Sequence, residues 1–407
     1  GNIKIKSIFP YNTKIQSIEF YCKIKCKNKT TNKKVNINLI IKTFENINTN
    51  INNYEKINLE LFDTVIVNST YKNDLIKQEY LIENYLNSSI LFLENNTHLH
   101  PYLIKKENNF FVKKGKWIIS EPIIIPKYHS LNILEETELL FTENSYIFID
   151  KGNININGTK LYNVKLKPAN NYWRGIYVIN SENSNIINAN IEGIKNFNAL
   201  NNLTGSVTFY NSKVILRNIN FNDSNSEDML NIVNSTFHID SLYFNNTYSD
   251  ALDIDFSNGI IKRSHFNNVG GDGIDTSGSN VQIENVYMFN IHDKSFSIGE
   301  KSNVTIINSN VNNVGVGIVS KDGSNTISKN NIIQNYKLAK YLAYKKKEYY
   351  SDGSNLVIFD EINNTKDIYS QKGSSILFNN IKIKNVEINI EKLYESTSMR
   401  KNGKKRN

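Results

Sequence analysis

The sequence reads SEDMLNI at 226–232, SDALDID at 249–255, GGDGIDT at 270–276 and HDKSFSI at 292–298. These four segments repeat one pattern with a stride of 22 residues, which arranges their polar residues in two columns. The first column holds Asp228, Asp250, Asp272 and Lys294, and the second, three residues further on, holds Asn231, Asp253, Asp275 and Ser297. Residues far apart along the chain are therefore expected to lie side by side in the fold.

Apolar residues follow the same stride. Steps of 22 or 23 residues separate Phe221, Phe244, Phe266, Met288, Val311 and Ile333. A repeat of this length, made of short alternating segments and Asn-rich bends, is typical of a parallel β-helix, because each coil buries its apolar face only against a neighbouring coil. We therefore predict an all-β protein whose main domain is a parallel β-helix of about 22 residues per coil.

Alternation within one coil predicts three strands, at Thr236–Asp240, Leu242–Phe244 and Leu252–Phe256. The side chains expected to point inward are Phe237, Ile239, Leu242, Phe244, Leu252 and Ile254. Those expected to point outward are His238, Asp240, Asp253 and Asp255. Asn245, Asn267 and Asn312 recur at the bend after the second strand, which indicates a ladder of stacked amides.

Changes in the pattern of apolar and polar residues along the chain indicate the domain organisation. Residues 1–108 alternate apolar and polar side chains in short runs and predict a small β-rich domain of the sandwich kind, with a short helix at 73–86. Residues 109–390 carry the β-helix, and the basic stretch 391–407 is predicted to be disordered. Cys22 and Cys26 are read on one strand, roughly 13 Å apart, which predicts that they form no mutual disulfide.

Composition narrows the range of partners. The formal charge is +9, from 48 basic and 39 acidic residues, and the basic surplus is spread along the chain. A diffuse positive charge attracts polyanions such as acidic polysaccharides, but no aromatic and basic recognition element for nucleic acid accompanies it. We expect no specific nucleic-acid partner. The sequence also shows no apolar run long enough to span a membrane.

The acidic columns are the candidate functional site. Coils stack at ~4.8 Å, and two carboxylates at that spacing repel by ~0.8 kcal/mol in water and by ~3 kcal/mol at an effective dielectric of 20. Lys294 supplies one counterion, and three explanations remain open for the rest. The carboxylates can cap backbone N–H groups at bends, bind Ca²⁺ through their oxygen atoms, or act as acid and base on a substrate.

Particular residues are assigned to the catalytic, cation-binding and ligand-binding roles. The catalytic hypothesis uses Asp250, Asp253, Asp272, Asp275 and Lys294. The cation hypothesis places Ca²⁺ between Asp253, Asp255 and Asp275. Further ligand contacts are assigned to Asp228, Asn231, Asp255 and Ser297.

From Trp117 onward the sequence resembles right-handed parallel β-helix proteins with a pectate-lyase-like fold. The segments that carry the resemblance include GKWIISEPIIIP, YWRGIYV, SDALDIDFSNG, GGDGIDTSGSNV and GIVSKDGS. In particular it resembles a bacterial group in which such a β-helix belongs to a longer exported chain, sometimes beside a spore-coat-kinase-like region. The resemblance covers residues 110–390 and implies a right-handed winding and an extracytoplasmic location.

The resemblance does not extend to the catalytic motifs of related enzymes. The Asn-Thr-Asp, Asp-Asp, Gly-His-Gly and Arg-Ile-Lys blocks of polygalacturonase-like enzymes are not intact here, and neither is the Asp-Pro-His-Asp block of mannuronan-epimerase-like enzymes. The leading hypothesis is therefore an exported or surface protein that binds an extended polymer, with a polysaccharide as the expected class, along its lateral face. One alternative is a lyase, hydrolase or epimerase of an acidic glycan, and another is a purely structural surface module.

Overall fold

A computed structural model describes residues 2–6, 13–22, 32–41, 46–50, 62, 64–71, 74–81, 96–196, 203–347, 350, 353–361 and 365–395. The chain divides into two compact units, Gly1–Phe92 and Leu93–Asn407. Among the described residues, no helix has the length and apolar character that crossing a bilayer requires.

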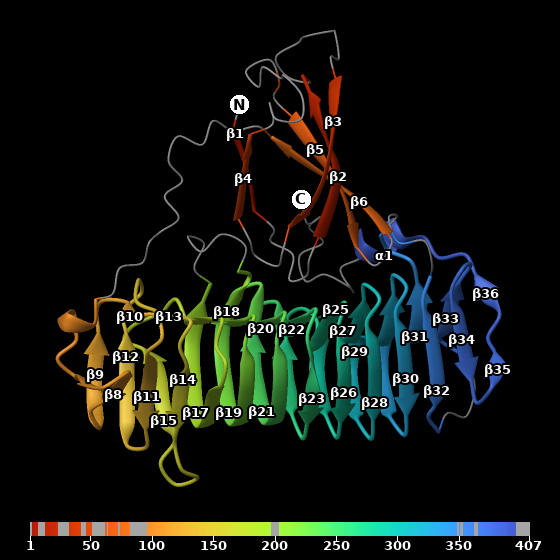
Figure 1. Ribbon diagram of the computed structural model, residues 1–407. Coiled ribbons are helices and arrows are strands. Elements are labelled where there is room, and N and C mark those ends of the chain that lie inside the picture. Colours follow the sequence, from red (N-terminus) through yellow and green to blue (C-terminus); the bar gives the residue numbers. More distant parts are fainter. Residues whose placement is uncertain are drawn as a thin grey trace. The chain divides into compact units, whose positions relative to one another are not determined.

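The first unit is built from antiparallel strands (Figure 1). A two-stranded sheet pairs β1 (Asn2–Lys6) with β4 (Asn46–Asn50). A four-stranded sheet has the order β3 (Asn32–Ile41), β2 (Thr13–Tyr21), β5 (Thr64–Tyr71) and β6 (Asp74–Leu81). The predicted small β-rich unit is thus confirmed as an antiparallel sheet, with Ile15, Ile18, Phe20 and Val35 in its core.

Two local predictions in this unit are wrong. Residues 74–81 form the strand β6 where a helix was predicted at 73–86, because β6 completes a sheet beside β5 and tertiary pairing overrides a weak helical pattern. Cys22 is disulfide-bonded. The strand β2 ends at Tyr21, so Cys22 lies just past it and the separation predicted for two residues of one strand does not apply; Cys26 lies outside the described residues.

The second unit is a parallel β-solenoid of about eleven coils with about 23 residues per turn. Its coils contribute to three parallel ladders. Ladder 1 contains β8 (Asn109–Val112), β11 (Ser130–Leu134), β14 (Ile154–Asn157), β23 (Asn258–Lys262), β26 (Asn280–Glu284), β28 (Asn303–Ile307), β30 (Asn325–Lys329), β32 (Asn355–Phe359) and β34 (Ser375–Phe378). Ladder 2 contains β9 (Gly115–Ile119), β12 (Thr137–Phe141), β15 (Val164–Pro168) and β24 (His265–Val269).

The third ladder, called the site ladder below, carries the candidate functional residues. It contains β10 (Ile123–Ile125), β13 (Ile147–Asp150), β16 (Ile176–Ile179), β18 (Gly205–Tyr210), β20 (Asp228–Val233), β22 (Asp250–Asp255), β25 (Ile274–Ser277) and β33 (Ile368–Gln371). Longer strands bend from one ladder into the next. β17 (Ser184–Lys195), β19 (Lys213–Asn225) and β21 (Thr236–Thr247) join ladders 1 and 2, and β27 (Tyr287–Gly299), β29 (Asn310–Lys321) and β31 (Ile332–Tyr344) join ladder 2 to the site ladder.

Short elements flank the coils. At the start, the 3₁₀ turn Thr97–Leu99 precedes β7 (Leu103–Lys106), which pairs antiparallel with β8. At the end, β35 (Ile381–Lys382) and β36 (Asn385–Val386) lead to the helix α1 (Ile390–Glu395). The segment predicted as a disordered tail therefore begins with helical residues 391–395, and residues from 396 onward lie outside the described residues.

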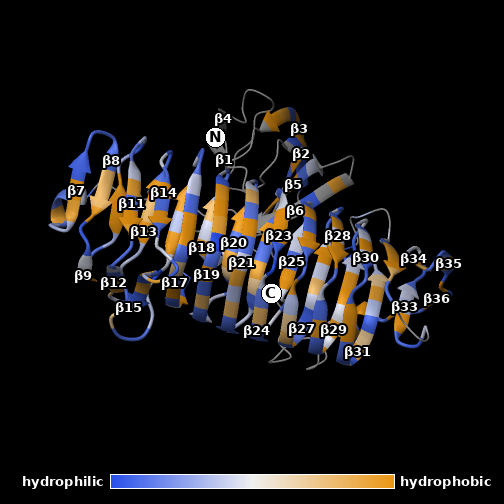
Figure 2. Ribbon diagram, turned by 90° about the horizontal axis from the view of Figure 1, so that it is seen from below, coloured by the Kyte–Doolittle hydropathy of each residue, from blue (hydrophilic) through white to orange (hydrophobic). Residues whose placement is uncertain are grey.

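The core confirms the predicted stride. Phe221, Phe244, Phe266, Met288, Val311 and Ile333 are successive register partners in ladder 2. The rings of Phe221 and Phe244 stack with centroids 5.0 Å apart, and those of Phe244 and Phe266 with centroids 4.8 Å apart. Apolar and polar bands alternate along the strands (Figure 2). Equivalent side chains thus recur because the backbone winds into stacked coils, each burying its apolar face on the next.

Asn side chains connect the coils at the bends. Asn267 donates to Asn245, and Asn245 donates to Asn222, each over 2.9 Å, so the predicted ladder is present in these coils. Phe289 takes the next position and interrupts it before Asn312. A second Asn column, Asn246, Asn268, Asn290 and Asn313, has left-handed φ values of 54–57°. Asn tolerates this conformation better than most residues, which explains its abundance at the bends.

Candidate functional site

One outward-facing column runs along the whole site ladder. Its register partners are, in order, Ile124, Phe148, Tyr177, Thr208, Asn231, Asp253, Asp275, Ser297, Val319, Leu342 and Tyr369. Polar side chains occupy the five central positions, from Thr208 to Ser297, and we call these five positions the polar window. The second predicted column therefore exists, and it is the central part of a longer one.

The first predicted column lies at the start of the same strands and caps backbone groups. Asp250 Oδ1 accepts a hydrogen bond from the backbone N–H of Asp272 at 2.8 Å, and Asp272 Oδ1 accepts one from the N–H of Lys294 at 3.0 Å. Each carboxylate thus accepts a hydrogen bond from a backbone N–H group of the next coil. The bend-cap explanation accounts for Asp250 and Asp272.

Asp228, at the start of this column, is different. It is 2 % exposed, and its Oδ2 atom is buried with no hydrogen-bond partner among the described residues. Burial, and next the charge of Asp250, raise the pKa of Asp228 well above its usual value. A group in this environment holds its proton more readily than an exposed aspartate does.

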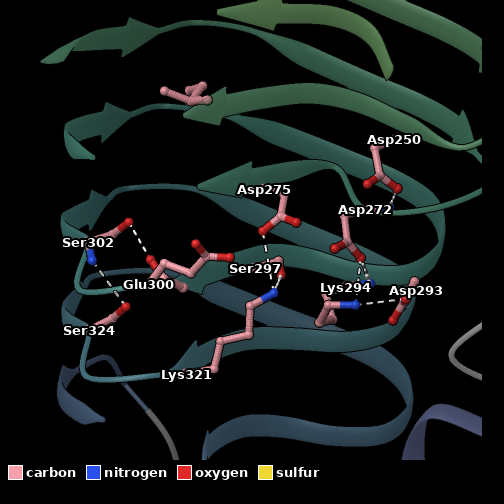
Figure 3. Close-up of polar contacts among 12 residues, drawn as sticks. Asp250, Asp272, Asp275, Asp293, Lys294, Ser297, Glu300, Ser302, Lys321 and Ser324 are labelled. Carbon is pink, nitrogen blue, oxygen red and sulfur yellow. Dashed lines mark hydrogen bonds and ion pairs between the residues drawn. The ribbon is translucent and has the colours of Figure 1, made fainter. Parts of the chain in front are cut away.

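Lys294 joins the columns to a buried ion-pair network (Figure 3). Its Nζ atom lies 2.9 Å from Asp272 Oδ1 and 2.7 Å from Asp293 Oδ2, and its side chain is 3 % exposed. Burial alone would lower the pKa of Lys294, but Asp272 and Asp293 raise it well above the usual lysine value. A protonated ammonium cannot accept a proton, so this geometry gives Lys294 a charge-pairing role and not that of a catalytic base.

Asp253 and Asp275 are register partners on β22 and β25, and neither carboxylate caps a backbone group in the way Asp250 does. Burial, and next the charges of Asp255 and Asp228, raise the pKa of Asp253 well above its usual value. Burial alone would also raise the pKa of Asp275, but the ammonium groups of Lys321 and Lys294 hold it below its usual value. The pKa values of these two neighbours are therefore shifted in opposite directions.

Asn231 and Asp255 complete the acidic half of the polar window. Asn231 Nδ2 lies 3.3 Å from Oδ2 of both Asp253 and Asp255 and donates to these two oxygen atoms. Burial raises the pKa of Asp255 to about 6, and the hydrogen bond from Asn231 opposes this rise. Asp255 lies two residues beyond Asp253 on the same face of β22, as predicted from the alternation.

Lys321 forms the basic half of the site and was not predicted from the sequence. Its Nζ atom donates to Ser297 Oγ at 2.6 Å and lies 3.5 Å from Asp275 Oδ1 (Figure 3). A signal for it exists, because three strides of 22 residues from Asp255 lead through 277 and 299 to Lys321. Asp293 was also missed, although it directly precedes Lys294.

Aromatic side chains border the basic half. The hydroxyl groups of Tyr344 and Tyr394 lie 2.6 Å apart, and the ring of Tyr394 lies 5.5 Å from Lys294 Nζ and 4.4 Å from Lys346 Nζ. Burial, and next the charges of Lys321 and Lys294, lower the pKa of Lys346 to about 8. Cationic groups over ring faces are stabilised by the ring quadrupole, so Tyr394 helps to hold these two lysines together.

Three carboxylates also converge closely enough to share a cation. One oxygen atom from each of Asp250, Asp272 and Asp275 lies within 4.8 Å of the others. Ca²⁺ takes oxygen ligands at 2.3–2.6 Å, so oxygen atoms at this separation can contact one ion. This set shares only Asp275 with the predicted one. Lys294 and Lys321 already pair with Asp272 and Asp275, so a cation would compete with two ammonium groups.

Comparisons with known proteins find remote similarities only. No family model matches the chain, and no curated protein matches it. Similar solved structures include an alginate lyase from Paenibacillus sp., with 13 % identity and a TM-score of 0.31, covering 60 % of this chain and 88 % of that one. A tailspike of an Acinetobacter phage has 8 % identity and a TM-score of 0.37, covering 68 % of this chain and 58 % of that one. A periplasmic alginate epimerase has 12 % identity and a TM-score of 0.30, covering 74 % of this chain and 85 % of that one. At this level of similarity the comparison assigns neither an activity nor a ligand to the chain.

Proposed function

We propose that the protein is an extracytoplasmic polysaccharide-binding protein and that the polar window holds the sugar. The observation that carries this proposal is a run of five polar positions, with the half-buried carboxyl groups of Asp253 and Asp275 among them, in an outward column whose other positions are apolar or aromatic. The fold does not need these carboxylates there, because neither Asp253 nor Asp275 supports a bend. Costly carboxylates that the fold does not require are characteristic of functional sites.

The chemistry of the window suits a sugar. Carboxylate oxygen atoms accept hydrogen bonds from hydroxyl groups. Asn231 is 2 % exposed and donates to Asp253 and Asp255, so it holds these two carboxyl groups in place. Asp253, Asp255 and Asp275 are half-buried, so a ligand can still reach them. Lys346 is half-buried at the basic half and can pair with the carboxylate of an acidic sugar. The site therefore offers contacts for neutral and uronate residues of one polysaccharide.

Binding to a panel of glycans tests this proposal. Polygalacturonate, polymannuronate and dextran are compared by affinity electrophoresis with the wild type, Asp253→Asn/Asp275→Asn and Asp223→Asn. Asp223 is the matched control, because it is an exposed carboxylate that accepts hydrogen bonds from Asn222 and Asn246 at a bend between coils. We expect at least one glycan to retard the wild type and Asp223→Asn but not the double variant. Equal retardation of all three proteins would contradict the proposal.

A second candidate function is cleavage of the bound glycan. It is favoured by the opposite pKa shifts of Asp253 and Asp275, because a protonated and an ionised carboxyl group side by side can act as acid and base. Asp253 would protonate the leaving oxygen atom of the glycosidic bond while the carboxylate of Asp275 attacks the anomeric carbon. Water, giving its proton to Asp253, would then release the sugar from Asp275. Adjacent strands separate the pair by ~4.8 Å of backbone, near the ~5 Å between the carboxyl groups of retaining glycosidases.

Cleavage and binding are separable. If Asp253 and Asp275 are catalytic, Asp253→Asn should abolish the release of new chain ends from a glycan that still binds the variant. Asp223→Asn should leave the release unchanged. If no glycan that binds is cut by the wild type, the protein is a binding module. Loss of binding without loss of folding in Asp253→Asn would place this residue in recognition.

A further inference from the structure

Lys294 and two aspartate side chains form a buried group, called the Lys294 triad below. The Lys294 Nζ atom lies 2.9 Å from Asp272 Oδ1 and 2.7 Å from Asp293 Oδ2. Lys294, Asp272 and Asp293 are 2 %, 5 % and 7 % exposed. Figure 3 shows the three side chains converging on one point. The proposed sugar contacts include none of these three side chains.

Aromatic side chains lie beside the triad. The ring centroid of Tyr394 lies 5.5 Å from Lys294 Nζ, and the hydroxyl groups of Tyr344 and Tyr394 lie 2.6 Å apart. The ammonium and the carboxylates are thus held away from water, where an ion pair recovers only part of the hydration free energy that its charges lose. A reaction that converted the pair into a neutral group would remove this cost.

Asp272 is held in position for attack on its carboxyl carbon. Its Oδ1 atom accepts a hydrogen bond from the backbone N–H of Lys294 at 3.0 Å, in addition to the contact with Nζ. A donor fixed on this oxygen atom stabilises the negative charge that develops when a nucleophile adds to the carbon. The Lys294 nitrogen, 2.9 Å from Oδ1, is also a close neighbour of that carbon, so the two groups meet without diffusion.

Asp293 is placed to carry protons between them. The pairing of β27 with β29 shifts register between Ile291 and Lys294, and the Asp293 carboxyl group reaches the amine of the next residue. The Asp293 Oδ1 atom is buried and has no hydrogen-bond partner among the described residues. Burial raises the pKa of Asp293 to about 7, and the charge of Lys294 opposes this rise. Such a carboxyl group can accept and donate a proton near neutral pH.

We propose that Lys294 and Asp272 condense into an amide bond that cross-links two adjacent coils. Nζ forms a bond to the Asp272 side-chain carbon, the bond from that carbon to Oδ2 breaks, and one water molecule leaves. Two protons pass from the nitrogen to the leaving oxygen, with Asp293 as their carrier, and Asp293 ends in its original state. An ammonium and a carboxylate together contain the atoms of one amide and one water, so no further reactant is needed.

Mass spectrometry of the full chain, denatured after folding and digested with trypsin, tests this proposal. Trypsin cleaves after free lysine, so a chain without the bond yields the peptides 264–294 and 295–301. A chain with the bond yields one peptide, 264–301, that is lighter by one water molecule, because the modified Lys294 is not cleaved. Lys321 is the internal control, since it pairs with Asp275 at 3.5 Å and cleavage after it should be complete.

We expect the cross-linked peptide in most wild-type molecules. Peptides 264–294 and 295–301 of ordinary mass in the wild type would overturn the proposal. Loss of water within 264–294, with cleavage after Lys294, would assign a cyclic imide at Asp272 and Gly273 and would overturn it as well.

Two variants test the assignment of the reacting groups. Lys294→Arg keeps the positive charge but has no amine, so its peptides should have ordinary masses. Asp293→Ala should also give ordinary masses while thermal unfolding remains cooperative. A folded Asp293→Ala protein that still forms the bond would overturn the role of Asp293. The wild-type spectrum decides the proposal even if Asp293→Ala does not fold.

Discussion

Asp253 and Asp275 lie opposite each other on adjacent parallel strands, yet their surroundings shift their pKa values in opposite directions. Asp253 faces Asp255 and Asp228, whereas Asp275 lies 3.5 Å from Lys321 Nζ. The site thus passes from an acidic half to a basic half within a single step of the coil.

The first prediction concerns pH. The pKa of Asp255 is raised to about 6 in the folded protein, from 3.8 in the unfolded chain. The folded state therefore binds more protons than the unfolded state between these values, and stability falls as pH rises from about 4 to about 6. Asp255→Asn should flatten this part of the profile of Tm against pH. An unchanged slope in the variant would contradict the raised pKa.

The second prediction concerns the buried lysine. Lys294→Met leaves Asp272 and Asp293 buried without their counterion and should lower the free energy of unfolding by ~3–5 kcal/mol. Adding Asp272→Asn should restore part of this loss. Lys262→Met is the matched control, because Lys262 forms a 3.1 Å ion pair with Glu284 at 32 % side-chain exposure and should cost ~0–1 kcal/mol. Urea unfolding measures all three, and equal costs for Lys294 and Lys262 would contradict the network.

The third prediction separates support from function. Asp250→Ala removes the acceptor of the Asp272 N–H and should cost ~1–2 kcal/mol. Asp253→Ala removes a carboxyl group whose ionisation is opposed by burial and by Asp255 and Asp228, and which caps no backbone group among the described residues, so Tm should stay the same or rise. Thermal unfolding of both variants under one condition compares them directly. A larger loss for Asp253→Ala than for Asp250→Ala would assign Asp253 a structural role.

The fourth prediction concerns Ca²⁺. Lys321 pairs with Asp275, and Lys294 pairs with Asp272, so the converging carboxylates already have two cationic partners. We expect equal Tm values for the wild type in Ca²⁺ and in chelator. Lys321→Met frees Asp275, and its Tm should rise with Ca²⁺ because an ion that binds only the folded state stabilises it. A wild-type Tm that falls on chelation would instead show that Ca²⁺ binds beside the lysines.

The sequence predicted the stacking of the coils because the stride of the apolar and acidic residues is set by the winding itself. The Phe column and the pairing of Asp253 with Asp275 follow from that stride alone. The stride does not predict at which position of a column an acidic residue is followed by an apolar or a basic one. One series of positions, spaced by 22 residues, holds Asp255, Ser277, Gly299 and Lys321. Only its first and last residues are charged, so the sequence pattern did not group Lys321 with the acidic residues.

Other features depend on long-range packing that no local pattern encodes. The helix α1 packs on the outward face of the site ladder because Leu342 and Val319 are apolar there. The sequence of α1 does not indicate that it packs against these two residues. The strand β6 is likewise fixed by pairing with β5. The protonation states of the Asp residues follow from burial and from Lys321, which become visible only in three dimensions.

The most direct test of the account is a ¹³C NMR titration of the Asp carboxyl groups in the folded protein, with Asp253 and Asp275 assigned from the spectra of Asp253→Asn and Asp275→Asn. We predict that the Asp253 carboxyl titrates well above the ordinary value of 3.8 and that the Asp275 carboxyl titrates below it. Two carboxyl groups that both titrate near the ordinary aspartate value would contradict the opposite pKa shifts of this pair.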